Sequence, residues 1–129
     1  MIKYNDFQKL DIRIGKVTEV LKVENADKLY KLQVDFGKDA SAHSVGSTSS
    51  LQVSSGQAGS GHKQVIAGIA DKFSESDLRD KLFPFVFNME PAKIRGLESQ
   101  AMILVAEDES KNLALLLPSK DIKPGSKIV

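Results

Sequence analysis

The sequence contains no cysteine, no tryptophan and only two histidines among its 129 residues. The lack of cysteine excludes disulfides, a thiol nucleophile and thiolate metal sites. No apolar run approaches the roughly 20 residues that a membrane-spanning helix needs, and the N-terminus shows no signal-peptide pattern. We therefore expect a protein that needs neither an oxidising compartment nor a membrane, and the cytoplasm is its default location.

An excess of charge of one sign is also lacking, because 18 Lys and Arg face 17 Asp and Glu for a net charge of +1. Such a small net charge excludes a strong global field that attracts polyanions. Any binding of nucleic acid must then come from a local cluster of cations. With 41% hydrophobic and 27% charged residues, the composition is that of a globular domain, and the length suits a single one spanning residues 1–129.

One stretch interrupts this composition, residues 40–61, with the sequence ASAHSVGSTSSLQVSSGQAGSG. Eight of these 22 residues are serine, four are glycine and none is charged. A segment of this kind buries too little apolar surface to offset the entropy of ordering it, so we predict a flexible insertion within the domain. Two origins fit the composition, an engineered insertion and a natural low-complexity loop.

The segments on both sides of the insertion are typical of β-strands. Residues 10–23 predict a long strand in which the apolar phase slips after Gly15-Lys16, the pattern of a β-bulge. Residues 30–36 alternate between apolar and polar side chains, as a half-buried strand does. Further strands are predicted at 64–69, 83–89, 101–106 and 113–117, with a short terminal strand after the turn at 123–126. In the second of these, Pro84 indicates an edge strand or a strand start.

A single helix is predicted from Ser74, which can cap it, to about Leu82, with Asp77 near its positive end. The pattern is therefore about five strands, the first of them bulged, with a helix between the third and the fourth. This order predicts an all-β protein, an OB-fold of five strands in a Greek-key barrel. A small α+β sandwich also fits, but it gives no reason for the bulge.

Three motifs carry a resemblance to a known family: residues 9–16 (KLDIRIGK), 25–29 (NADKL) and 88–104 (NMEPAKIRGLESQAMIL). In this order they resemble the tRNA-binding domain at the C-terminus of many methionyl-tRNA synthetases. Similar domains occur as free-standing tRNA-binding proteins and in the EMAP-II-type cofactors of eukaryotic synthetase complexes. The resemblance extends over the whole chain except the insertion.

The resemblance implies an OB-fold that grips tRNA by its shape and backbone, with little regard to base sequence, as an accessory to an aminoacyl-tRNA synthetase. It also implies a homodimer, with residues 122–129 as a candidate contact. The positions that match the family's binding residues are Asn25, Lys28, Lys93, Arg95, Ser99 and Met102. Lys31 joins them as a further cation at the start of the second predicted strand.

The chemistry of these residues suits RNA, because cations bind phosphates while amide and hydroxyl groups bind sugar and backbone oxygens. The first and last strand connections flank the binding face of an OB-fold, so two separate basic clusters could meet on one groove. Each residue also has a purely structural interpretation. The amide of Asn25 could serve its own turn, Lys28 and Lys31 could be solvated strand charges, Ser99 could be a strand-end hydrogen-bonding group, and Met102 could pack in the core.

No motif for catalysis is present, so we expect neither an enzyme nor a cofactor. His43 and His62 lie on either side of the insertion without a third ligand at a suitable spacing, and a metal site is not expected there. A second hypothesis is a protein- or peptide-binding module, either chaperone-like or an engineered scaffold that displays the insertion. In that case binding would depend on residues 51–53 of the insertion rather than on Lys28, Lys93 and Arg95.

Overall fold

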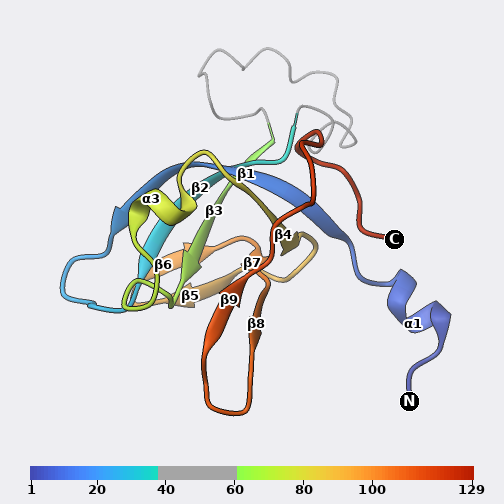
Figure 1. Cartoon of the computed structure of the whole chain (residues 1–129), viewed down its shortest axis with the longest axis horizontal. Coiled ribbons are helices and arrows are strands. Elements are labelled where there is room, and N and C mark those ends of the chain that lie inside the picture. Colours follow the sequence, from blue (N-terminus) through green and yellow to red (C-terminus); the bar gives the residue numbers. More distant parts are fainter. Residues whose placement is uncertain (38–60) are drawn as a thin grey trace.

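The structure is a computed structural model that describes residues 1–37 and 61–129 (Figure 1). The predicted insertion at 40–61 lies outside the described residues except for Gly61. The elements in chain order are α1 (Tyr4–Gln8), β1 (Ile12–Lys22), β2 (Tyr30–Asp35), β3 (His62–Ala67), α3 (Glu75–Leu78), β4 (Leu82–Val86), β5 (Ala92–Ile94), β6 (Leu97–Ser99), β7 (Met102–Ile103), β8 (Val105–Glu107) and β9 (Leu113–Leu115).

Five antiparallel strands form the main sheet in the order β3-β2-β1-β4-β7. The two ends of this sheet approach each other, because the Gln100 amide donates to the Gln64 carbonyl at 2.8 Å and the Ile66 amide donates to Ser99 Oγ at 2.9 Å. The sheet is thus a nearly closed barrel, and α3 lies between β3 and β4 in the chain (Figure 1). The predicted OB-like barrel is confirmed.

The core fills this barrel with the inward-facing side chains of alternate strand positions. Tyr30, Leu32, Val34 and Phe36 are all buried, which confirms the alternation predicted for this segment. Phe36 packs edge to face on Phe85, with ring centroids 5.3 Å apart, in an arrangement that aromatic pairs prefer. Leu78, the last residue of α3, has a fully buried side chain that closes one end of the barrel.

The bulge of β1 exists but lies further along the strand than predicted. The register with β2 shifts between Val17 and Glu19, so the extra residue is Thr18 and the placement at Gly15-Lys16 is wrong. Gly15 serves close packing instead, since a Cβ there would stand 2.5 Å from Val34 Cγ1 and 2.7 Å from Phe36 Cε1. The phase slip in the sequence was real, but glycine marked a tight contact and not the bulge.

The predicted helix begins as expected and ends early. The Ser74 amide donates to the Asp77 carboxylate at 2.9 Å, as half of a capping box does. The helix stops at Leu78 rather than Leu82, because Arg79 is extended and Asp80 has a φ of 65°. This left-handed residue turns the chain into β4, which already starts at Leu82.

Pro84 indicated an edge strand or a strand start; the first is wrong because β4 is internal, and β4 starts two residues before Pro84, at Leu82. The carbonyl of Pro84 accepts from the Leu104 amide just where β7 ends. The N and the O of one residue in an antiparallel strand point to the same side, so the N–H that Pro84 lacks would also face Leu104. Because β7 ends at Ile103, its absence interrupts no hydrogen bond between β4 and β7. Met89, the last residue of the strand predicted at 83–89, lies outside β4 and is 39% exposed.

The apolar run 101–106 divides into β7 and β8 instead of forming one strand, and β8 pairs with β9 as a separate hairpin. The strand predicted at 113–117 is present as β9, which ends at Leu115. Helix α1 and the β5–β6 hairpin were not predicted. Among the described residues no helix is both long and apolar enough to cross a membrane.

The C-terminal segment lies against β1 beyond the end of β2. Ile14 exchanges backbone hydrogen bonds with Gly125 and Ser126, and Lys127 forms a bridge with Arg13. The short terminal strand predicted after the turn is thus reduced to this isolated bridge, and the last strand of the chain is β9. Because β2 covers only the second half of β1, the C-terminal segment pairs the half that β2 leaves free.

Candidate nucleic-acid interface

The turn between β1 and β2 is a compact, hydrogen-bonded structure. The amide of Ala26 donates to the Val23 carbonyl at 3.1 Å, and the Ala26 side chain is buried. Asn25 has a φ of 63°, a left-handed conformation that asparagine tolerates better than most residues. The carbonyl of Lys28 accepts from Ala70 at 2.9 Å, which ties the turn to the segment after β3. The side chains of Asn25 and Lys28 remain exposed on this fixed backbone.

The predicted residues Lys93 and Arg95 belong to the β5–β6 hairpin. Its strands pair Ala92 with Ser99, Lys93 with Glu98 and Ile94 with Leu97, and Arg95-Gly96 forms the two-residue turn. Both turn residues have positive φ, 53° for Arg95 and 82° for Gly96, as a type I′ turn requires. An arginine rarely adopts this conformation, which makes Arg95 a strained residue at an exposed tip.

The hairpin has two different faces. Ile94, Leu97 and Ser99 lie on the face that packs on the barrel, and they are partly or fully buried. Lys93 and Glu98 lie on the opposite face, where both are exposed. The hairpin therefore presents one cation and one anion to solvent, with the guanidinium of Arg95 beyond them at the tip.

The turn and the hairpin tip lie toward the same end of the barrel. Gln100 is bonded to Gln64, and Ser99 is bonded to Ile66. The chain that leads from Gln100 back to the hairpin tip therefore runs beside β3 toward the C-terminal end of that strand. That end of β3 pairs with Tyr30, the first residue after the β1–β2 turn. Figure 1 shows the turn and the hairpin on the same side of the molecule.

The other three predicted site residues lie neither in the β1–β2 turn nor at the hairpin tip, because Lys31 is the second residue of β2, Ser99 ends β6 and Met102 begins β7. Lys31 is half-buried on the outer face of β2, between Leu21 and Ile66. Met102, on β7, is 43% exposed and lies further from the hairpin tip than Ser99. Ser99 is buried, and its hydroxyl accepts from Ile66 while it donates to the Ala101 carbonyl at 2.9 Å. In this structure the hydroxyl of Ser99 thus joins the ends of the sheet.

Sequence reasoning missed the hairpin and with it the position of Glu98 opposite Lys93. The signal was present, since residues 92–94 and 97–99 each place a charged residue between two uncharged ones around the Arg95-Gly96 turn. A dipeptide that ends in glycine between two such triplets is typical of a tight hairpin. The arginine hid it, because the usual first residue of such a turn is asparagine, aspartate or glycine.

A second group of charges caps the opposite end of the barrel. Arg13 forms two hydrogen bonds to the Asp11 carboxylate, at 2.8 and 2.9 Å, and its guanidinium carbon lies 4.2 Å from the Phe87 ring centroid. Lys63 Nζ lies 4.0 Å from the same centroid. The bond to Arg13 holds the pKa of Asp11 below its usual value, while burial and the nearby Arg13 charge lower the pKa of Lys63. Asp11 and Arg13 of the first family motif therefore have a structural role.

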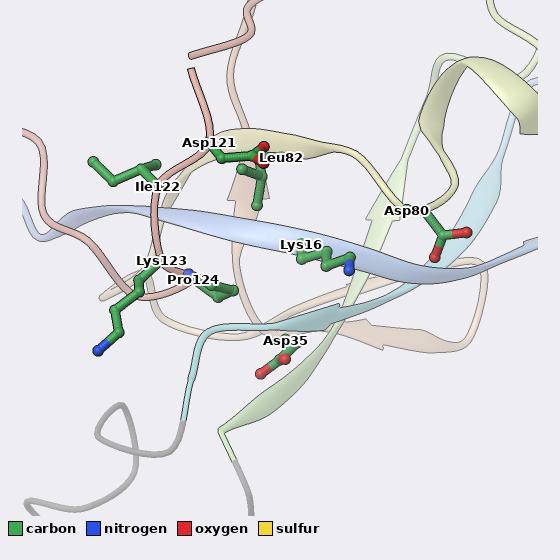
Figure 2. A pocket seen from close by; sticks show the side chains of 8 residues that line it. All are labelled: Lys16, Asp35, Asp80, Leu82, Asp121, Ile122, Lys123 and Pro124. Carbon is green, nitrogen blue, oxygen red and sulfur yellow. The ribbon is translucent and has the colours of Figure 1, made fainter. Parts of the chain in front are cut away.

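An open cleft of about 540 Å³ lies between the barrel and the C-terminal segment. Figure 2 shows three carboxylates around it, those of Asp35, Asp80 and Asp121, together with the ammonium groups of Lys16 and Lys123. Three anions against two cations disfavour phosphate, so this cleft does not suit a nucleic acid. The turn and the hairpin, which carry the cations, form the better candidate interface.

Comparison with known proteins agrees with this assignment of the fold. The chain is 37% identical over 127 residues to "Methionine--tRNA ligase" of Thermococcus onnurineus, an alignment that covers 98% of this chain and 14% of the ligase. The chain therefore spans about a seventh of that relative's length. Among solved structures, the MetRS related protein from Pyrococcus horikoshii superposes with a TM-score of 0.80 at 27% identity, covering 100% of this chain and 98% of that one.

A second solved structure, the chaperone CsaA of Bacillus anthracis, superposes with a TM-score of 0.75 at 26% identity, and 100% of this chain and 99% of that chain are covered. The family described as "Putative tRNA binding domain" matches residues 40–127. This match includes the β5–β6 hairpin and covers more than half of the chain. The chain therefore belongs to the tRNA-binding domain family.

Proposed function

We propose that this chain binds tRNA without catalysis, largely independently of base sequence, through the surface formed by the β1–β2 turn and the β5–β6 hairpin. We name this surface the turn–hairpin surface and define it by Asn25, Lys28, Lys31, Lys93 and Arg95. One observation carries the proposal: two cations from distant parts of the sequence, Lys28 and Arg95, lie exposed toward one end of the barrel in a chain with a net charge of only +1. Family membership supports RNA as the partner.

The chemistry of the turn–hairpin surface favours recognition of the backbone over recognition of bases. Lysine and arginine contact phosphates through charge, and such contacts fix position while they carry no sequence information. None of the side chains of this surface is aromatic, so Arg95 is its one side chain with a planar group on which a base could stack. Ser99 and Met102 remain predicted contacts, and neither is needed for the proposal.

Its physiological role would be that of an accessory to an aminoacyl-tRNA synthetase in the cytoplasm, where it raises the concentration of tRNA near the catalytic body. Support comes from the similarity to ligases seven times longer than this chain. We also propose a homodimer that uses the C-terminal segment. The contact would lie at residues 122–129, where the exposure of Ile122 (46%) supports it, and sedimentation equilibrium of the purified chain tests it.

The salt dependence of tRNA binding tests the proposed function. With about four to six phosphate contacts, the logarithm of the binding constant should fall with the logarithm of salt concentration at a slope of roughly −3 to −5. The double variant Lys93→Ala, Arg95→Ala should weaken binding of every tRNA alike and reduce the slope by about 1 to 2.

A matched control removes two exposed cations elsewhere, Lys3→Ala and Lys120→Ala, and should change the affinity much less. Binding that is flat with salt, or absent at low and physiological salt, would contradict tRNA binding. A loss confined to one tRNA would contradict recognition of the backbone.

A protein- or peptide-binding module is the second candidate function, and the similarity to the chaperone CsaA is the observation that favours it. Residues 51–53, which the second hypothesis relies on, lie outside the described part of the chain. Binding of an unfolded polypeptide that persists in the Lys93→Ala, Arg95→Ala variant, together with loss of tRNA binding, would show two separate activities. Polypeptide binding without tRNA binding in the unchanged chain would favour the module alone.

A further inference from the structure

Glu98 is an acidic residue paired across the β5–β6 hairpin with a cation of the turn–hairpin surface, Lys93. It lies directly opposite Lys93 across the two strands of the β5–β6 hairpin, and both side chains are exposed on the same face. Side chains paired in this way have Cβ atoms about 4.5–5.5 Å apart, close enough for their charges to interact. A phosphate that approaches the ammonium group of Lys93 therefore also approaches the carboxylate of Glu98.

The backbone holds Glu98 in this position. Its carbonyl accepts from Gln64 Nε2 at 2.9 Å, which fastens the hairpin to β3. The next residue, Ser99, is buried and bonded to Ile66, and the type I′ turn fixes the pairing register at the other end. A shift of the Glu98 backbone away from Lys93 would break these contacts, so the carboxylate stays on the same face of the hairpin as the cation when RNA binds.

We propose that Glu98 limits the affinity of the turn–hairpin surface for nucleic-acid phosphates. Its charge offsets that of Lys93 in the free protein and repels phosphates that contact Lys93 or Arg95. This inference rests on the proposed function and adds a residue that nothing in the comparison with known proteins assigns. Moderate affinity suits a protein that must release tRNA, because differences in affinity at one interface are mostly differences in the dissociation rate.

The effect should be local and modest. Both side chains are exposed, and exposed charges interact weakly because water and salt screen them. Replacement of the carboxylate by an amide of the same shape should therefore raise the tRNA affinity at low salt by roughly two- to fivefold. The gain should shrink as salt rises toward 0.5 M, where the screening length falls to roughly 4 Å, shorter than the expected separation of the charges.

The test compares Glu98→Gln with Glu109→Gln in tRNA titrations at low salt. Glu109 is exposed in the turn of the β8–β9 hairpin, so its replacement changes the net charge equally without touching the β5–β6 hairpin. We expect Glu98→Gln to bind roughly two- to fivefold more tightly and Glu109→Gln to bind within about 1.5-fold of the unchanged chain. In a Lys93→Ala background the gain from Glu98→Gln should fall by at least half, because its partner is gone.

Equal gains in both glutamine variants, or no gain in Glu98→Gln, would overturn the inference. In either case the loss of binding in the Lys93→Ala, Arg95→Ala variant would still support the proposed function. If the unchanged chain binds no tRNA, and Glu98→Gln binds none either, the proposed function and the inference fail together. Circular dichroism and thermal melting of each variant confirm that the barrel is intact.

Discussion

Replacement of Ser99 by alanine separates the two interpretations of this residue, a contact to RNA and a bond that closes the barrel. In the structure the Ser99 hydroxyl accepts from the Ile66 amide at 2.9 Å and donates to the Ala101 carbonyl at 2.9 Å. Only 7% of the residue is exposed. Alanine would leave a buried donor and a buried carbonyl without their partner, at the point where the two ends of the sheet meet.

The size of the effect follows from these two bonds. A buried polar group that loses its partner costs about 1–3 kcal/mol, and a carbonyl with a second lone pair costs less than an amide. We therefore expect Ser99→Ala to lower the free energy of unfolding by about 2–4 kcal/mol, out of a total of about 5–15 kcal/mol for a domain. For a chain of this length the midpoint of thermal unfolding should fall by roughly 5–15 °C.

Urea unfolding followed by circular dichroism measures this loss, with Ser126→Ala as the control. The hydroxyl of Ser126 also donates to a carbonyl, that of Lys123 at 2.7 Å, but in an exposed turn, so its removal should cost less than about 1 kcal/mol. The reasoning is refuted if Ser99→Ala unfolds at the same urea concentration as the unchanged chain. Lost tRNA affinity with unchanged stability would show instead that Ser99 contacts RNA.

Two further predictions concern the C-terminal segment and the opposite end of the barrel. Gly125→Ala should destabilise the fold by more than about 2 kcal/mol, because φ is 95° and a Cβ would clash with the Phe36 carbonyl oxygen. Its control, Gly96→Ala, has a φ of 82° but open space around the Cβ, and should cost only about 1 kcal/mol. Equal losses in urea unfolding would contradict the contact between residue 125 and Phe36. The bond to Arg13 lowers the pKa of Asp11 in the folded state. As the pH falls, the Asp11 carboxylate is therefore protonated in the unfolded chain before it is protonated in the folded one, and the folded state loses stability below about pH 4. Urea unfolding from pH 7 to pH 3 should show a smaller loss in Asp11→Asn than in the unchanged chain, and parallel curves would show that Asp11 contributes nothing to this acid sensitivity.

Periodic patterns predicted the barrel because burial itself imposes the period. The alternation from Tyr30 to Phe36 required only that one face be buried, and the structure buries that face completely. The helix start predicted at Ser74 was equally local, since the bond found there, from the Ser74 amide to the Asp77 carboxylate, spans three residues. Where one segment contains its own evidence, the sequence was sufficient.

Features that depend on distant contacts escaped prediction. The glycine at position 15 was ambiguous in sequence because a bulge and a tight contact both favour glycine, and only the positions of Val34 and Phe36 decide between them. Pro84 indicated an edge strand, yet the early end of β7 leaves its missing donor without consequence. Helix α3 stops early because Asp80 adopts a left-handed conformation that its sequence does not require.

The candidate site shows the same division. The net charge of +1 already meant that any binding of nucleic acid needs a local cluster of cations. The family resemblance then named most of the residues of that cluster. That Lys28 and Arg95 lie toward the same end of the barrel depends on the hydrogen bonds that join β3 to Ser99 and Gln100 at the end of β6, and no local pattern contains these bonds. The same bonds explain the burial of Ser99, whose sequence context fits a surface hydroxyl equally well.

The central claim is that tRNA contacts the turn–hairpin surface, and backbone amide resonances during a tRNA titration test it most directly. We expect the largest shifts in the ¹H–¹⁵N spectrum at residues 25–31 and 93–96. Residues 121–127, beside the cleft lined by Asp35, Asp80 and Asp121, should change little. Shifts confined to that cleft or to the β8–β9 hairpin would contradict the account, even if tRNA binds tightly.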